Sequence, residues 1–221
     1  MVRGFFITGT DTGVGKTVVS AALVLTLRAA GPVRYWKPIQ PGIEQDDDTA
    51  AVASLAACSA AELVASGVRL PRPLSPHLAA RLGGTAIDLT PLEDTFNTAA
   101  HSAHVVVEGA GGALVPLNGV QLMTDLMSRL DLPVVIVARS TLGTINHTLL
   151  TIEALQRRSL YVAGVVMVGP PNRDNRDAIE QYGSVPVLGE MPVFDPLTPE
   201  RLAQWSATEF DRSHHLLAML R

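Results

Sequence analysis

The sequence has little of several features that mark specialised classes of protein. It contains one cysteine, Cys58, so no disulfide can form within the chain, and this composition is typical of a reducing compartment. No apolar run reaches the ~18 residues that a membrane-spanning helix needs, and the first apolar run is too short for a signal peptide. The net charge is −4 without a basic cluster, which argues against nucleic acid as the main partner. We therefore expect a cytoplasmic protein with neither a membrane nor a nucleic-acid partner.

What the sequence does contain predicts an α/β fold. No repeat, linker or low-complexity tract divides the 221 residues, so we predict a single domain over residues 1–221. Short apolar runs predict buried strands near residues 5–8, 33–36, 104–107, 132–138, 162–168 and 186–189. The segments between them predict helices near residues 18–25, 49–57, 60–65, 76–82, 92–103, 123–130, 143–157, 174–182, 199–207 and 214–220. This alternation predicts a mostly parallel sheet with helices on both faces, and ligands at the carboxyl ends of its strands.

The most informative stretch, residues 5–17, reads as an apolar strand, a glycine turn and the start of a helix. Gly13 and Gly15 let backbone N–H groups approach an anion closely, and the helix directs the positive end of its dipole to the same place. Lys16 would reach the β- and γ-phosphates of a nucleotide, and the Thr17 hydroxyl would hold Mg²⁺. The stretch therefore predicts a phosphate-binding loop and a fold like that of the P-loop NTPases.

The loop is not a strict match to the pattern G-x-x-x-x-G-K-[ST], because Thr10 stands where the pattern has glycine. The alternative is a glycine-rich turn in which Lys16 is incidental. The apolar strand before the turn and the apolar helix after it favour phosphate binding over that alternative.

Further polar residues follow other predicted strands. Glu108 is placed to organise a metal beside Thr17, although a carboxylate at this point could also cap the next turn. Lys37 ends a buried strand, where a cation is costly unless it meets an anion; the alternative is a side chain that extends to the surface at the sheet edge. The acidic run 46–48 is typical of a solvated helix start, but one of its members can also be a second Mg²⁺ ligand.

Residues 142–147 open the helix that is predicted near residues 143–157. The exposed N–H groups at such a start suit a carboxylate or a phosphate. An ordinary helix start, with Thr144 as the capping residue, is the alternative.

Taken together, these segments resemble one family. The motifs occur in order at residues 8–17, 35–40, 75–77, 107–112, 142–147 and 188–192. This arrangement is similar to that of dethiobiotin synthase, an ATP-dependent enzyme of biotin biosynthesis, and it covers nearly the whole chain. Thr10 is part of that family's own loop pattern.

The resemblance implies a reaction, its cofactors and an assembly. CO₂ or bicarbonate supplies the carbon that adds to an amine of 7,8-diaminononanoate as a carbamate. The carbamate oxygen attacks the γ-phosphate of ATP, and the second amine then displaces phosphate and closes a cyclic urea. Mg²⁺ is the implied metal. The tail carboxylate of the substrate is expected to bind the helix start of a second subunit, which implies a homodimer with the substrate site at the subunit interface.

The resemblance also implies roles for individual residues. Lys16 and Lys37 would be catalytic, stabilising charge on the carbamate and on the transferring phosphoryl group. The implied ligands of the metal are Thr17, Asp48 and Glu108. The implied nucleotide-binding residues are Gly13, Val14, Gly15, Lys16, Thr17, Val18, Asp48, Glu108, Gly109, Ala110, Gly111, Val168, Gly169, Pro192, Val193 and Phe194. The implied substrate-binding residues are Thr12, Lys37, Pro41, Gly143, Thr144, Ile145 and Asn146.

Three positions depart from the family pattern. Gly13 stands where some relatives have Glu, and Pro41 stands where a small hydroxyl residue is usual. Some relatives read adenine with an Asn-Asp pair where this chain has Val168-Gly169. Because these two residues and the prolines that follow offer no side-chain hydrogen bond to a base, we expect weak selectivity among nucleoside triphosphates.

Two other functions are the alternatives. Partitioning and cell-division ATPases share the expected fold and act as dimeric switches on DNA or membranes, but they carry a second lysine at the place of Asp11. The chain also lacks a basic patch and a basic amphipathic tail. An amidotransferase-linked enzyme acting on a corrinoid acid is the third possibility, but no glutaminase domain is present.

Overall fold

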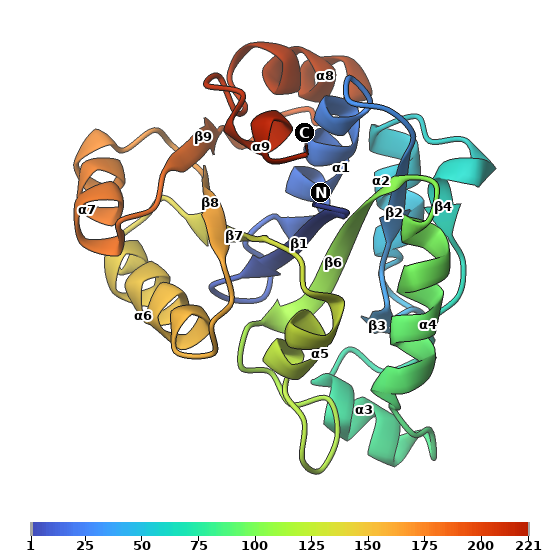
Figure 1. Cartoon of the computed structure of the whole chain (residues 1–221). Helices are drawn as coiled ribbons and strands as arrows, with labels where there is room; N and C mark the ends of the chain where they lie inside the picture. The colour runs from blue at the N-terminus through green and yellow to red at the C-terminus, as the bar shows by residue number, and fades with distance from the viewer. Residues whose placement is uncertain (1, 221) are drawn as a thin grey trace.

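A computed structural model describes residues 2–220 of the chain. Its centre is a seven-stranded sheet in the order β4-β2-β6-β1-β7-β8-β9, in which every neighbouring pair is parallel (Figure 1). The strands are β1 (Gly4–Gly9), β2 (Val33–Trp36), β4 (Leu63–Val64), β6 (His104–Gly112), β7 (Val134–Arg139), β8 (Val162–Val168) and β9 (Val187–Met191). The predicted parallel sheet is confirmed.

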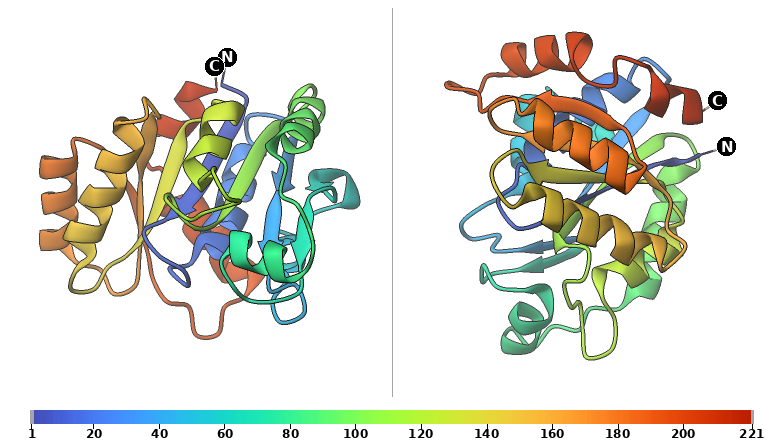
Figure 2. Two further views of the ribbon diagram at one scale, coloured as in Figure 1. Left: turned by 90° about the horizontal axis from the view of Figure 1, so that it is seen from below. Right: turned by 90° about the vertical axis from the view of Figure 1, so that its left-hand side faces the viewer.

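Helices cover both faces of this sheet (Figures 1 and 2). One face packs against α1 (Lys16–Leu27), α2 (Asp48–Leu55), α8 (Pro199–Thr208) and α9 (His215–Met219). The other packs against α3 (Pro76–Leu82), α4 (Leu89–Ala100), α5 (Met123–Leu130), α6 (Thr144–Gln156) and α7 (Arg173–Gly183). Alternate residues of β1 enter different cores, with Phe5 and Ile7 in the first and Phe6 in the second. Both faces of the strands are therefore buried, which explains their continuous apolar runs.

The segment between β2 and α3 differs from the prediction. The expected helix at residues 60–65 is wrong: a single 3₁₀ turn, η1 (Ala60–Glu62), leads into β4, whose Leu63 pairs with Tyr35 of β2. A separate two-stranded parallel sheet, β3 (Ile39–Pro41) with β5 (Val68–Leu70), was not predicted. Strands of two or three residues carry no readable periodicity, and here backbone pairing with a neighbouring strand overrides the local helical preference.

The strand order brings three chain segments to one place. Strand β6 lies between β1 and β2, so the loop after β1 and the residue after β2 flank the end of β6. The register pairs Ile7 with Glu108 and Trp36 with Val107, which puts Lys37 level with Glu108. Carboxyl ends of central parallel strands are where ligands bind in sheets of this kind. Within the described residues, no helix is both long and apolar enough to cross a membrane.

Candidate active site

The glycine loop after β1 has the backbone shape of an anion cradle. Gly13 has φ +72° and Gly15 has φ +100°, the left-handed region that favours glycine. A Cβ on Gly15 would lie 3.3 Å from the side chain of Val168, whereas a Cβ on Gly13 would meet no atom within 4 Å. Gly15 is also the N-terminal cap of α1, and no side chain among the described residues caps that helix. The first N–H groups of α1 therefore face the loop, as phosphate binding requires.

Lys16 is buried inside this loop, with 7% of its surface exposed. Its Nζ donates to the carbonyl oxygen of Asp11 at 3.0 Å. Burial, followed by the nearby charge of Lys37, lowers the pKa of Lys16. The Asp11 carboxylate in turn accepts the Thr12 N–H at 2.7 Å and pairs with Arg139 at 2.6 Å. Among residues 2–220, the Lys16 ammonium is thus held by a carbonyl of the loop itself and pairs with no carboxylate.

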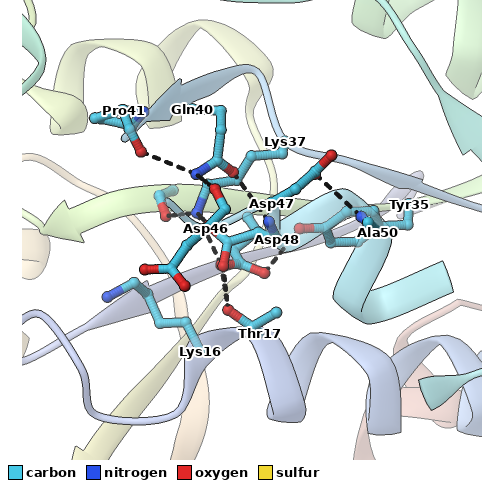
Figure 3. Close-up of polar contacts among 12 residues, drawn as sticks. Lys16, Thr17, Tyr35, Lys37, Gln40, Pro41, Asp46, Asp47, Asp48 and Ala50 are labelled. Carbon is cyan, nitrogen blue, oxygen red and sulfur yellow. Dashed lines mark hydrogen bonds and ion pairs between the residues drawn. The ribbon is translucent and has the colours of Figure 1, made fainter. Parts of the chain in front are cut away.

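Lys37 is held differently, between two carboxylates (Figure 3). Its Nζ lies 2.8 Å from Oε1 of Glu108 and 2.7 Å from Oδ2 of Asp48, and it donates to the Gly109 carbonyl at 3.1 Å. Burial acts to lower the pKa of Lys37, but the charges of Glu108 and Asp48 outweigh it and raise that pKa. Burial likewise acts to raise the pKa of Asp48, but Lys37 outweighs it and the pKa is lowered. Lys37 and Asp48 therefore form an ion pair.

The three predicted metal ligands meet at the same point. The Thr17 hydroxyl donates to Oδ1 of Asp48 at 2.6 Å and lies 3.3 Å from Oε1 of Glu108. Three oxygen atoms from α1, α2 and β6 thus converge, and oxygen ligands are what Mg²⁺ prefers. The residues present therefore fit such a cation.

Of the acidic run 46–48, only Asp48 joins this cluster. The side chain of Asp47 caps α2 by accepting the Ala50 N–H at 3.0 Å, and the Asp46 side chain is exposed. Asp47 therefore has the ordinary helix-start role that was the alternative interpretation of the run, whereas Asp48 contacts Thr17 and Lys37.

Two residues at this cluster were missed by the sequence analysis. Tyr35, which is fully buried, donates its hydroxyl to Oε2 of Glu108 at 2.9 Å. Gln40, which is 3% exposed, donates to the carbonyls of Pro41 at 2.9 Å and Asp46 at 3.2 Å. The available signal was a polar group in a short buried segment, since a buried tyrosine hydroxyl or amide usually has a partner.

A hollow of about 500 Å³ opens beside the glycine loop. Asp11 and Thr12 line one side, and His147, Leu150 and Thr151 of α6 line the other. Thr12 therefore lines a cavity next to the glycine loop. Pro41 uses its carbonyl to hold Gln40, and it has no N–H to offer to a substrate.

The helix start at residues 143–146 is not among the residues that line this hollow in the described chain. Gly143, with φ +92°, is the N-terminal cap of α6, and no side chain in the described part of the chain caps the helix. The alternative in which Thr144 caps the helix is therefore wrong: its hydroxyl is buried and lies 3.4 Å from that of Thr148. Leu142, just before this start, is fully exposed.

The predicted base region lies at the ends of β8 and β9. The Gly169 N–H already donates to the Met191 carbonyl at 2.9 Å. Val193 is 74% exposed, and Phe194 is partly buried against the core. Other predicted nucleotide-binding residues lie in the loop after β1, at the start of α1 and in the last residues of β6. Val14 and Ala110 are buried, Val18 is partly buried and Gly111 has φ +71°.

Comparison with known proteins assigns the family. The family described as an AAA domain matches residues 3–201. The ATP-dependent dethiobiotin synthetase of Paramagnetospirillum magneticum is 52% identical over 202 residues, which cover 91% of this chain and 94% of the relative. The chain belongs to the ATP-dependent dethiobiotin synthetase family. The resemblance that the motifs predicted is confirmed, and the chain is an ATP-dependent enzyme of the ligase class in biotin biosynthesis.

Other dethiobiotin synthetases support the assignment. That of Agrobacterium fabrum is 44% identical over 216 residues, 96% of each chain. The biotin biosynthesis bifunctional protein of Bordetella avium is 50% identical over 205 residues. Those residues cover 92% of this chain but only 42% of that longer relative.

Solved structures confirm the fold class. A ParA family ATPase from Chlorobium tepidum has a TM-score of 0.58 at 10% identity, with 93% of this chain and 99% of that chain covered. The septum site-determining protein MinD from Pyrococcus horikoshii, in complex with Mg-ADP, has a TM-score of 0.56 at 15% identity, with 92% of this chain and 86% of that chain covered. The fold is therefore that of the P-loop NTPases. At such identities only the fold is shared, and the switch-type ATPase function is not favoured over the dethiobiotin synthetase function.

Proposed function

We propose that this chain closes the ureido ring of dethiobiotin from 7,8-diaminononanoate, CO₂ and ATP. The observation that supports this proposal most directly is the buried Lys37, which lies beside Glu108 and Asp48 near the glycine loop. The chain also belongs to the dethiobiotin synthetase family. A carbamate and a transferring phosphoryl group are both anionic. Two buried cations at one sheet edge, Lys16 and Lys37, are suited to stabilising that charge.

The glycine loop would hold the triphosphate of ATP. This role is supported by the left-handed backbone conformation of Gly13 and Gly15 and by the start of α1, which has no side-chain cap among the described residues. Both features direct backbone N–H groups to one position. Lys16, whose only partner in the described chain is a carbonyl oxygen, can turn to the phosphates without leaving a carboxylate unpaired.

Thr17, Asp48 and Glu108 would hold Mg²⁺, which when bound would neutralise charge on the phosphates. In the structure, the Lys37 ammonium bridges the same two carboxylates that would bind the metal. Lys37 and Thr17 contact the same oxygen of Glu108, Oε1, but different oxygens of Asp48, so Lys37 and a divalent cation would compete for the Glu108 oxygen. The Lys37 ammonium would in turn stabilise the negative charge of the carbamate.

The diamine would occupy the hollow that Thr12 lines, with catalysis by positioning and charge stabilisation. We propose a homodimer in which residues 143–146 of a second copy bind the tail carboxylate of the substrate. Support comes from exposed apolar side chains at the hollow and the helix start: Leu114 is 49%, Leu142 100% and Leu150 56% exposed. Leu114 and Leu150 line the hollow, and exposed apolar groups at a depression are typical of an interface.

Three further expectations belong to this proposal. Residues 1–221 would act as one domain, the partners would be small molecules and a second copy instead of nucleic acid or membrane, and the enzyme would work in the cytoplasm. The single cysteine supports the last of these, because reducing compartments leave such residues unpaired.

The test is product formation from defined substrates. The protein is incubated with ATP, Mg²⁺ and bicarbonate, with and without 7,8-diaminononanoate, and phosphate and dethiobiotin are both measured. We expect phosphate and dethiobiotin in equal amounts, and little phosphate when the diamine is omitted. Phosphate release that is independent of the diamine, without dethiobiotin, would contradict the proposal and favour a switch-type ATPase.

A further inference from the structure

We infer that Tyr35 is a positioning residue for the metal site: its hydroxyl fixes which oxygen of Glu108 faces the bound cation. The inference rests on the proposed function, since it concerns the metal ligands of that reaction. Tyr35 does not reach the substrate hollow, and it would act only through Glu108.

The geometry follows from the sheet. Tyr35 lies on β2 and Glu108 on the neighbouring β6, where Tyr35 pairs with Val106. Because side chains alternate along a strand, Val106 and Glu108 share a face, and Tyr35 lies on that face too. The Tyr35 hydroxyl extends along the two paired strands and donates to Oε2 of Glu108 at 2.9 Å. Tyr35 is 0% and Glu108 1% exposed, so water does not compete for this hydrogen bond.

The two carboxylate oxygens of Glu108 therefore have different partners. Oε2 accepts from Tyr35, while Oε1 lies 2.8 Å from the Lys37 ammonium and 3.3 Å from the Thr17 hydroxyl. A neutral phenol is only a donor toward a carboxylate, and it occupies Oε2 whether the other oxygen faces a lysine or a metal. Oε1 is left as the oxygen directed at the cation position.

Removal of the hydroxyl would free the carboxylate to rotate. In Tyr35→Phe, Oε2 is a buried acceptor without its partner, and it can regain one by turning toward Lys37. The carboxylate would then no longer present a fixed oxygen to the metal. Loss of a group that orients a metal ligand typically lowers metal affinity or activity by ~10–100-fold.

The test measures metal binding directly. Mn²⁺ binding in the presence of ADP is followed by electron paramagnetic resonance for the wild type, Tyr35→Phe, Glu108→Gln and the control Tyr161→Phe. Tyr161 is 57% exposed and far from these residues in the strand order, just before β8. We expect ~10–100-fold weaker Mn²⁺ binding for Tyr35→Phe and wild-type binding for Tyr161→Phe. In turnover, the Mg²⁺ requirement should rise by the same factor while KM for the diamine stays unchanged.

A double variant separates positioning from general damage and covers the case in which Tyr35→Phe alone folds poorly. If Tyr35 acts through Glu108, adding Tyr35→Phe to Glu108→Gln should weaken Mn²⁺ binding no further. The inference would be overturned if the two substitutions weakened Mn²⁺ binding additively. It would also be overturned if a folded Tyr35→Phe variant bound Mn²⁺ as tightly as the wild type. If Glu108→Gln itself leaves Mn²⁺ binding unchanged, the metal assignment in the proposed function fails instead, so the two failures are distinguishable.

Discussion

The ammonium of Lys37 lies 2.7 Å from the carboxylate of Asp48, although the Lys37 side chain is only 3% exposed. Glu108 lies 2.8 Å from the same ammonium and is 1% exposed, so this second contact is buried, whereas the Asp48 side chain is 23% exposed. Breaking a buried ion pair by removing one partner typically costs ~3–5 kcal/mol, because the remaining charge has no compensation. Lys37 therefore contributes to stability as well as to the proposed chemistry.

Lys16 and Lys37 should respond differently to truncation. We expect Lys37→Ala to lose turnover and also ~3 kcal/mol or more of the free energy of unfolding, since two carboxylates lose their cation. Lys16→Ala should lose turnover by a charge-stabilisation effect of ~3 kcal/mol but little stability, because its partner is one carbonyl oxygen. Urea unfolding and dethiobiotin formation measure the two effects, with Arg157→Ala, an exposed site, as the control. An active Lys37→Ala enzyme would remove Lys37 from the mechanism.

Competition between Lys37 and a metal for the Glu108 and Asp48 carboxylates predicts an effect in the absence of nucleotide. Replacement by a neutral chain of similar length, Lys37→Met, leaves Asp48 and Glu108 without their cation. Added Mg²⁺ should then raise the melting temperature of Lys37→Met far more than that of the wild type, because ligands that bind only the folded state stabilise it. In the control Lys37→Met/Asp48→Asn, which has one carboxylate fewer, the Mg²⁺ effect should shrink. Equal Mg²⁺ shifts in wild type and Lys37→Met would show that the lysine and the metal do not compete.

The base region predicts weak selectivity among nucleotides. The Gly169 N–H is already used by Met191, the two prolines that follow have no N–H, and Val168 packs on Gly15 of the phosphate-binding loop. We expect GTP and CTP to bind within ~1–2 kcal/mol of ATP, about the size of one good hydrogen bond. Competition binding on the nucleotide-free protein measures this. A preference for ATP of about a thousandfold, ~4 kcal/mol, would show that other backbone groups read the base.

A site shared between two copies predicts complementation between inactive variants. Lys37→Ala damages the half of the site that lies at the glycine loop of one copy. Asn146→Asp damages the other half, because it places a negative charge at the helix start that would bind the substrate carboxylate. After subunit exchange in an equal mixture, about a quarter of all sites would combine two intact halves, as a two-fold interface requires. A mixture of Lys37→Ala with Lys16→Ala, both on the loop side, should regain nothing. Absence of recovery in the first mixture, with mixed dimers verified by two tags, would contradict the shared site.

The sequence was most informative where long apolar runs and glycines coincide. The strand at residues 162–168 was predicted with the bounds that the structure has, and the loop ending at Thr17 was recognised from its glycines and its flanking elements. Such features are local: a buried parallel strand has to be apolar on both faces, and a left-handed turn favours glycine. This is why the fold class was predictable from the residues alone.

The features that the sequence did not predict depend on contacts between residues that are distant in the chain. Tyr35 bonds to Glu108, 73 positions away, and strand β4 exists because Leu63 pairs with Tyr35. Neither relation leaves a periodic pattern in the sequence. Gln40 holds the loop before Asp48 through backbone carbonyls, which any residue could supply. Tertiary contacts of this kind decide the details of the site, and local sequence patterns do not record them.

The order of strands in the sheet also has a consequence for the synthesis of the chain. β1 and β2 are consecutive in sequence, but β6 lies between them in the sheet. While the ribosome makes the chain, the place between these two strands stays open until residues 104–112 emerge. The phosphate-binding loop, Lys37 and Asp48 are all made before the carboxylate that joins them. A nascent chain therefore carries most of the site's charged groups but gains the complete site only when β6 inserts, which makes that insertion the step at which exposed strand edges are most vulnerable to aggregation.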